Sequence, residues 1–133
     1  MELLLDTHVL IWWSLDSAKL SRKVYELLTD PGNVHVISIA SVWEIQVKVQ
    51  LGKLDLGVKL PELIAHQKQV NNLQILPIDP THIYALENLP NEHRDPFDRI
   101  TIAQAMVEEM PFLSADRVFA LYPIDRVWWK FIL

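Results

Sequence analysis

Short apolar runs alternate along the chain with longer segments in which apolar residues recur at helical spacing. Residues 3–5 form an uninterrupted apolar run, and residues 34–39 form a second run that is rich in β-branched side chains. Runs of this kind are typical of strands that are buried on both faces of a parallel sheet. Residues 20–28, 60–70 and 97–109 have the spacing of amphipathic helices. The order strand, helix, strand, helix predicts an α/β domain with a parallel sheet.

Turn residues and helix caps mark the boundaries of further elements. Residues 30–33 (Asp-Pro-Gly-Asn) are a strong breaker, Gly52 stops one helix, and Pro80 suits the first turn of another. Asp6 or Thr7 would cap the first helix. The pattern predicts strands at residues 3–5, 34–39, 73–78, 112–114 and 124–131, and helices at residues 7–15, 20–28, 39–51, 60–70, 80–89 and 97–109, with a short helix up to Tyr122.

Length and composition limit the class of protein. With 133 residues the chain is expected to form a single domain, residues 1–133, that buries about two thirds of the surface of its unfolded form. The absence of cysteine excludes disulfides and thiolate metal sites, which fits a reducing cytosol. The N-terminus lacks a basic leader, and no apolar run approaches the ~20 residues of a membrane span. We therefore expect a cytoplasmic protein with no membrane partner.

The net charge of −5 argues against a broad basic face for nucleic acid. The total is misleading, however, if several acids line one metal site. Bound divalent cations would then reverse the local sign, and Arg and Lys at the rim would meet phosphate. The charge therefore leaves a metal-dependent nucleic-acid enzyme open.

Three carboxylates follow predicted strands. Asp6 comes directly after the first strand, at the sheet edge where open α/β folds bind ligands. The strand predicted at residues 112–114 likewise ends on a hydroxyl, Ser114, with the carboxylate of Asp116 two residues later. Capping of the following helix is the structural alternative for Asp6 and for Asp116. Glu44 lies three residues after Ser41, which is the spacing of a capping box; otherwise it points over the carboxyl edge of the sheet.

A fourth carboxylate, Asp98, lies in the most distinctive segment. Asp95 precedes a proline and is therefore assigned mainly to capping the helix. Asp98 shares a helix face with core-like positions such as Thr101, where an unpaired carboxylate is costly. Arg94 or Arg99 would pair with it in a purely structural interpretation. We favour a functional role for Asp98.

If these four acids converge, their mutual repulsion requires a cation between them. Two carboxylates about 4 Å apart repel by roughly 4 kcal/mol at an effective dielectric constant of 20. Oxygen ligands without cysteine point to Mg²⁺ or Mn²⁺. Such ions activate water and stabilise the leaving oxygen in phosphodiester hydrolysis. The sequence therefore predicts a metal-dependent nuclease site with four catalytic and metal-binding acids: Asp6, Glu44, Asp98 and Asp116.

Taken in order, these motifs resemble the PIN-domain ribonucleases, in particular the VapC-type toxins of bacterial and archaeal toxin–antitoxin pairs. Each motif is weak alone, but the ordered set covers nearly the whole chain. The matching residues are Leu4-Leu5-Asp6-Thr7-His8, Ser38-x-x-Ser41-x-x-Glu44-Ile45, Asp98-x-x-x-Ile102-Ala103-x-Ala105 and Ser114-x-Asp116.

The resemblance implies a fold, a reaction and partners. The fold would be a three-layer α/β/α sandwich with a central parallel sheet, and Mg²⁺ or Mn²⁺ would be held by the four acids. The reaction would be endonucleolytic cleavage of RNA by a homodimer that a cognate antitoxin neutralises. Thr7 and Ser114 would orient carboxylates and waters, and Arg94 and Arg99 would be candidates for phosphate contact.

Other protein classes fit the sequence less well. A haloacid dehalogenase-type phosphatase needs a second aspartate where His8 stands, and three glycines cannot form a Gly-rich phosphate loop. His8 replaces the Asn or Ser of many family members, so its role is open. A non-catalytic PIN-like interaction module is the main alternative, and magnesium titration would separate the two. The tryptophan pairs suggest a dimer or antitoxin interface: Trp12, Trp13, Trp128 and Trp129.

Overall fold

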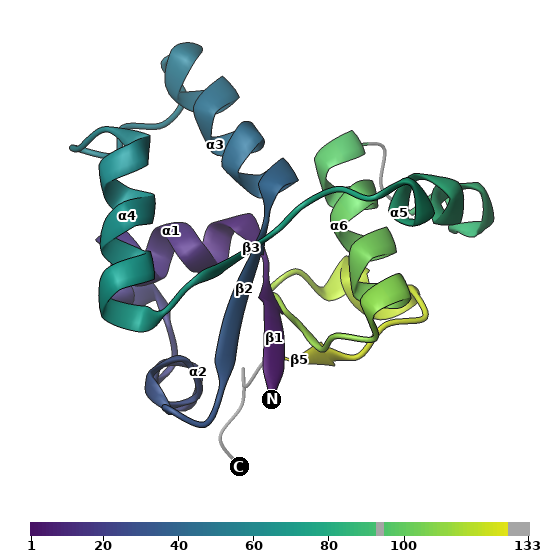
Figure 1. Ribbon diagram of the computed structural model, residues 1–133, viewed down its shortest axis with the longest axis horizontal. Coiled ribbons are helices and arrows are strands. Elements are labelled where there is room, and N and C mark those ends of the chain that lie inside the picture. The colour runs from purple at the N-terminus through teal and green to yellow at the C-terminus, as the bar shows by residue number, and fades with distance from the viewer. Residues whose placement is uncertain (93–94, 128–133) are drawn as a thin grey trace.

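One parallel sheet runs through the protein (Figure 1). The computed structural model describes residues 1–92 and 95–127. Within these residues, five strands lie side by side in the order β3-β2-β1-β4-β5, and every neighbouring pair is parallel. The strands are β1 (Glu2–Leu5), β2 (Val34–Ser38), β3 (Gln74–Leu76), β4 (Phe112–Leu113) and β5 (Arg126–Val127).

Helices connect the strands and cover both faces of the sheet. In the part of the chain that the structure describes, none of them is long and apolar enough to cross a membrane. The α-helices are α1 (Thr7–Leu15), α2 (Arg22–Thr29), α3 (Ile39–Gln50), α4 (Leu60–Asn71), α5 (Pro80–Ala85) and α6 (Pro96–Glu108), and the 3-10 helices are η1 (Ser17–Lys19), η2 (Leu86–Asn88) and η3 (Arg117–Leu121).

The central strand β1 divides the hydrophobic core in two. Leu3 and Leu5 point into one cluster, which contains side chains from α1, α2 and α4, whereas Leu4 points into the other, which contains side chains from α6. All three leucines are fully buried, which is worth about 1.5–3 kcal/mol each. Figure 1 shows α1, α2 and α4 on one side of the sheet and α5 and α6 on the other. The predicted α/β/α sandwich is therefore confirmed.

Most predicted elements are present with small shifts at their ends. The strand predicted at residues 73–78 is only Gln74–Leu76, because Pro77 has no N–H to donate to a neighbouring strand. The helix predicted at residues 80–89 narrows to a 3-10 turn after Ala85. The last strand is short, and residues 128–131 of its predicted range lie outside the described residues.

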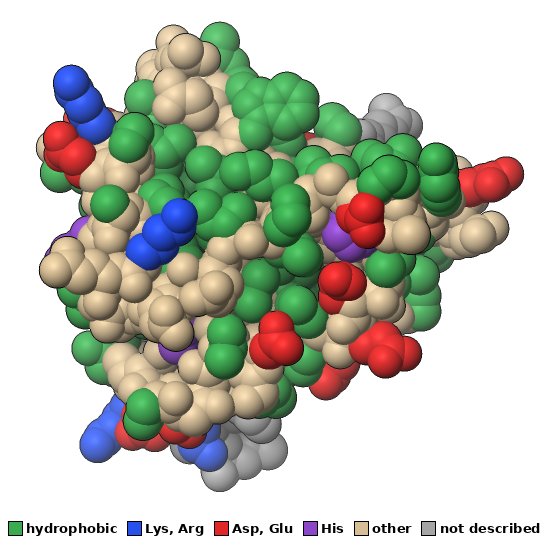
Figure 2. Space-filling view, in the orientation of Figure 1, with side chains coloured by type: hydrophobic (Ala, Val, Ile, Leu, Met, Phe, Trp, Pro, Cys, Tyr) green, Lys and Arg blue, Asp and Glu red, His purple; other side chains and the backbone are tan. Residues whose placement is uncertain are grey.

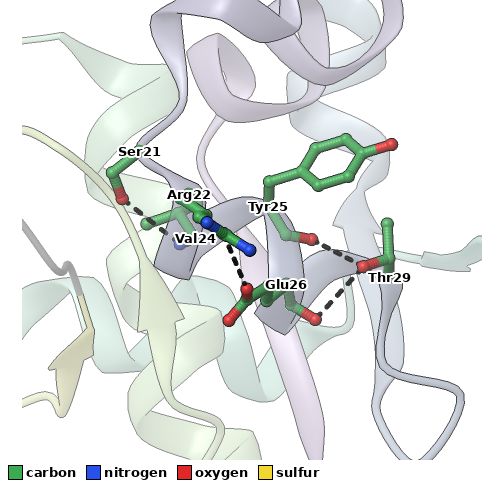
Figure 3. A network of polar contacts seen from close by, with 6 residues as sticks. All are labelled: Ser21, Arg22, Val24, Tyr25, Glu26 and Thr29. Carbon is green, nitrogen blue, oxygen red and sulfur yellow. Dashed lines mark hydrogen bonds and ion pairs between the residues drawn. The ribbon is translucent and has the colours of Figure 1, made fainter.

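Helix α2 shows how local side chains set the ends of an element (Figure 3). The hydroxyl oxygen of Ser21 accepts a hydrogen bond from the backbone N–H of Val24 at 3.2 Å. At the other end, the Thr29 hydroxyl is within hydrogen-bonding distance of the carbonyls of Tyr25 at 2.9 Å and Glu26 at 3.3 Å. Because Ser21 is the cap, the helix begins one residue after it and not where the apolar spacing starts.

The N-terminal tryptophan pair is half-buried. Trp12 and Trp13 both pack against the cluster that contains Leu3 and Leu5. Trp13 meets the ring of His35 edge-on, with 4.9 Å between ring centroids. A role of this pair in a partner interface stays a prediction. The second pair, Trp128 and Trp129, lies outside the described residues.

His35 gives the fold a testable dependence on pH. Its side chain on β2 is 4% exposed, and burial lowers the pKa of the imidazole from its ordinary value of 6.5, while backbone carbonyls of Asn71 and Leu27 act more weakly in the opposite direction. The folded state therefore binds fewer protons than the unfolded state as the pH falls below about 6.5. We expect the free energy of unfolding to decrease there, by at most about 1.4 kcal/mol per pH unit for this one proton.

Urea unfolding of the wild type and of His35→Gln between pH 7.5 and 5.5 would check this. A plot of the free energy of unfolding against pH should be less steep for the variant, because it lacks the contribution of His35. This holds whatever the stability of the variant at pH 7.5. Because the other histidines are common to both proteins, equal slopes in the two would show that His35 does not control this dependence.

Candidate active site

The strand order brings the predicted acids to one edge of the sheet. From β1 the chain first adds β2 and β3 on one side and later β4 and β5 on the other, so the order reverses between β1 and β4. Ligand sites of open α/β sheets lie at the carboxyl ends of the strands beside such a switch point. Leu5 pairs with Leu113 in this register. The next residues, Asp6 and Ser114, therefore emerge near one another.

Asp6 uses its carboxylate for this neighbour and not for capping α1. It occupies the N-cap position, but its side chain makes no capping hydrogen bond. Instead, the Ser114 hydroxyl donates to Oδ2 of Asp6 at 2.8 Å. Asp6 is 7% exposed. Burial raises the pKa of its carboxyl, the hydrogen bond from Ser114 and the charge of His8 lower it, and the charge of Glu44 raises it further.

Glu44 is a buried side chain of the site and not part of a capping box. Helix α3 begins at Ile39, and its cap is Ser38, whose hydroxyl oxygen accepts from the Ala40 N–H at 3.0 Å. The capping alternative built on Ser41 is therefore wrong. Glu44 lies in the second turn and accepts a hydrogen bond from the Thr7 hydroxyl at 2.8 Å.

Asp98 shows that the acids form one electrostatic cluster. It lies in the first turn of α6, three residues after the capping residue Asp95. The Oδ1 atom of Asp95 accepts a hydrogen bond from the Phe97 N–H at 2.8 Å. The pKa of Asp98 is raised to about 7, first by burial and then by the charges of Asp95, Asp6, Glu44 and Asp116. The other three predicted site acids thus all act electrostatically on Asp98, together with the helix-capping Asp95.

Asp116 combines capping with membership of this cluster. It is exposed, and its Oδ1 accepts from the Val118 N–H at 3.0 Å, so the capping alternative is correct for this residue. Its own N–H donates to the Ser114 hydroxyl oxygen at 3.1 Å. Ser114 therefore links Asp116 to Asp6. The orienting roles predicted for Ser114 and Thr7 require contacts of this kind, and they stay predictions.

Of the two basic residues predicted for phosphate contact, the structure describes only Arg99, which donates hydrogen bonds to backbone carbonyls. The guanidinium of Arg99 donates to the carbonyls of Pro90 at 2.9 Å and Leu86 at 3.5 Å, and so holds the connection before α6. These contacts favour a structural role, although phosphate contact is untested. Arg94 lies outside the described residues. His8 is exposed in the first turn of α1, with 6.0 Å between the centroids of its ring and that of Trp12.

Sequence reasoning missed one cation of the cluster, Lys48. Its Nζ lies 2.9 Å from Oε2 of Glu44, and the lysine side chain is 35% exposed. Burial acts to lower the pKa of the ammonium, but the hydrogen bond and charge of Glu44 and the charges of Asp95 and Asp98 outweigh it and raise the pKa. The signal was present in the sequence, because residues four apart on a helix are neighbours.

Oxygen donors make the cluster chemically suited to a hard divalent cation such as Mg²⁺ or Mn²⁺. In the present side-chain positions, however, no three His, Asp or Glu side chains of the described residues are placed to hold one ion together. Lys48 instead supplies positive charge to Glu44. The donor set fits a divalent cation, which would compete with the Lys48 ammonium for Glu44.

Comparison with known proteins agrees with the fold. The model of the PIN domain family matches residues 3–124. No curated protein sequence matches the chain.

Several solved structures share the architecture. VapBC2 from Rickettsia felis, bound to a DNA fragment from its promoter, aligns over 92% of this chain and 94% of that chain, with a TM-score of 0.67 and 17% identity. A toxin-antitoxin complex from Klebsiella pneumoniae aligns over 90% and 92%, with a TM-score of 0.56 and 20% identity. A domain of a functionally unknown protein from Methanocaldococcus jannaschii aligns over 99% and 93%, with a TM-score of 0.60 and 16% identity. At these identities the likeness shows the fold alone.

The repulsion at Asp98 should be measurable as a stability cost. Its pKa is higher in the folded protein than the ordinary 3.8, so at pH 8 the ionised carboxylate favours the unfolded state. We expect Asp98→Asn to melt about 4 °C or more above the wild type in EDTA, equivalent to roughly 1 kcal/mol for a domain of this size. Added Mg²⁺ should raise the melting temperature of the wild type more than that of the variant.

Differential scanning fluorimetry of both proteins, with Asp125→Asn as a control for loss of an acid elsewhere, checks this. Asp125 is exposed and is not among the acids whose charges act on Asp98. An unchanged or lower melting temperature for Asp98→Asn in EDTA would contradict the repulsive cluster.

Proposed function

The chain belongs to the PIN domain family, and we propose that it is a metal-dependent endoribonuclease, the toxin component of a toxin–antitoxin pair. Family members are generally nucleases, which sets the reaction class. The observation that carries the proposal is the convergence of acids at one edge of the sheet: the Ser114 hydroxyl donates to Asp6 and accepts from the Asp116 N–H, and the hydroxyl of Thr7, next to Asp6, donates to Glu44. The raised pKa of Asp98, to which the charges of these acids contribute, agrees with this convergence. A cluster that repels itself in the folded state is expected where a cation is to be bound.

The chain's own residues have separable tasks in this proposal. Asp6, Glu44, Asp98 and Asp116 would hold Mg²⁺ or Mn²⁺, which when bound activates water and stabilises the leaving oxygen of the phosphodiester. The remaining tasks fall to the residues that contact these acids.

Two hydroxyl groups would keep the acids in position. Ser114 donates to Asp6 and Thr7 donates to Glu44, so each hydroxyl holds one carboxylate oxygen in place. Such outer contacts orient ligands and tune their basicity. Lys48 balances the charge of Glu44 while no divalent ion is bound. Arg94 and Arg99 are retained as candidates for phosphate contact.

The partners are proposed from the structures that this fold resembles. They include VapBC2 from Rickettsia felis and a toxin-antitoxin complex from Klebsiella pneumoniae. We therefore propose a cognate antitoxin as the inhibitor. RNA as the substrate and a homodimer in the cytoplasm are proposed from the resemblance of the sequence motifs to PIN-domain ribonucleases.

A non-catalytic PIN-like interaction module is the second candidate. It is favoured by the contact between Lys48 and Glu44, together with the lack of three described His, Asp or Glu side chains gathered around one point. A module of this kind would bind no divalent ion at the four acids. Calorimetric titration with Mg²⁺ and Mn²⁺ therefore separates the two candidates.

Cleavage of a mixed RNA pool tests the enzyme directly. We expect the purified protein to cut RNA in Mg²⁺ or Mn²⁺ and not in EDTA. An Asp6→Asn, Asp98→Asn double variant should lose more than the ~10- to 100-fold that removal of an outer-shell partner typically costs, because it removes two proposed ligands. Asp125→Asn should cut at the wild-type rate.

The pattern of results identifies the failing assumption. Cutting that persists in the double variant would point to a contaminating ribonuclease. Ion binding without cutting would indicate a narrow substrate range or a copurified antitoxin. Absence of both ion binding and cutting would refute the enzyme and leave the interaction module.

A further inference from the structure

A large aromatic side chain is exposed beside the carboxylate cluster. Trp43 lies on α3 and is 62% exposed, although Ser41, Glu44 and Ile45 around it in sequence are buried. In the orientation of Figure 1, hydrophobic side chains cover the region between α3 and α6 in the space-filling view (Figure 2). An exposed indole next to a buried acid is unusual for a side chain that proteins mostly bury. It requires a functional explanation or a partner.

The indole of Trp43 is held in place by a second aromatic ring. Its centroid lies 5.0 Å from that of Phe97 on α6, and the two ring planes are 85° apart. This is the edge-to-face arrangement that aromatic pairs prefer. Phe97 is half-buried and packs against the core cluster that contains Leu4 and Ile102. The pair, here named the aromatic platform, therefore has one anchored ring and one exposed ring.

The platform is joined to the proposed catalytic acids from both helices. Trp43 immediately precedes Glu44 on α3, and Phe97 immediately precedes Asp98 on α6. Successive helix residues point about 100° apart, so each ring faces away from the acid that follows it in sequence, but the contact between the two rings joins the helices that carry Glu44 and Asp98. A chain whose phosphate lies at these acids would pass its adjoining base over this surface. Because α3 and α6 pack against each other, the two rings are positioned by the same helices that position Glu44 and Asp98.

Resting on the proposed function, we propose that the exposed indole of the aromatic platform, Trp43, which Phe97 supports edge-on, stacks a nucleobase of single-stranded RNA beside the scissile phosphate. Proteins that recognise single-stranded RNA commonly stack unpaired bases on aromatic side chains. Stacking needs no positive charge, so it would add to RNA affinity in a chain whose net charge is −5. A nucleobase therefore fits both the exposed ring and its acidic surroundings.

Binding of short fluorescein-labelled homopolymers of A, C, G and U, measured by anisotropy in Ca²⁺, tests the platform apart from cleavage. The proteins would be Asp6→Asn, which blocks cutting, and the same variant carrying Trp43→Ala or Trp43→Phe. We expect Trp43→Ala to weaken binding by roughly 5- to 150-fold and Trp43→Phe to restore most of it. Tyr84→Ala is the matched control, because Tyr84 is 72% exposed on α5 and adjoins no proposed catalytic acid.

Abasic nucleotides identify the stacked base. Replacing single nucleotides of the RNA in turn should reveal one position at which loss of the base weakens binding to the Trp43 protein. The same replacement should have no further effect on the Trp43→Ala protein, since the two losses remove one contact. Equal effects of the abasic position on both proteins would overturn the proposal.

The remaining outcomes separate this inference from the proposed function. Unchanged RNA binding by Trp43→Ala would overturn the platform, and a simultaneous loss of self-association in sedimentation would assign Trp43 to an interface between copies. RNA binding that depends on Trp43, in a wild-type protein that neither binds a divalent ion nor cuts RNA, would overturn only the hydrolase. Absence of RNA binding by every form of the protein would overturn both.

Discussion

The mutual repulsion of carboxylates at the carboxyl edge of the sheet is the main constraint that the rest of the protein has to balance. Asp6, Glu44 and Asp116 all raise the pKa of Asp98, which burial raises first. The fold tolerates this cost because each element that brings an acid to the edge is well anchored. Strand β1 is buried on both faces, and α3 and α6 pack against each other. Such a cluster is stable only with compensating donors or a cation.

The compensation is distributed over groups with different tasks. Ser114 and Thr7 donate to Asp6 and Glu44, and Lys48 places a positive charge on Glu44. These contacts explain how the protein remains folded before any divalent ion binds. They also imply a competition in the proposed enzyme, since an ion bound at Glu44 would displace Lys48 from it. Metal affinity and stability are therefore expected to depend on the same few side chains.

An acidic nuclease also has to hold a polyanion, and the aromatic platform addresses this difficulty. Two of the nearby basic side chains are held by other groups: Lys48 contacts Glu44, and Arg99 donates to the carbonyls of Pro90 and Leu86. In the proposed enzyme, a divalent ion that neutralises the acids would bind the RNA phosphate, and the uncharged aromatic ring would bind the adjoining base. Catalysis and RNA binding would then share the same two helices.

The sequence by itself determined the α/β class, the buried strand before Asp6 and the cap at Asp95, because apolar runs and capping residues act over a few positions. It also indicated the four acids: Asp6 and Asp116 follow strands, and Glu44 and Asp98 lie near the starts of helices. Tertiary structure decided what each side chain does. Ser38 caps α3 and so releases Glu44 from a capping box, whereas Asp116 does cap its helix. Trp43 meets Phe97 through the packing of α3 on α6, whereas the pairing of Lys48 with Glu44 follows from their spacing on one helix and was present in the sequence. Contacts between elements distant in sequence follow from strand order and helix packing, which local patterns do not encode.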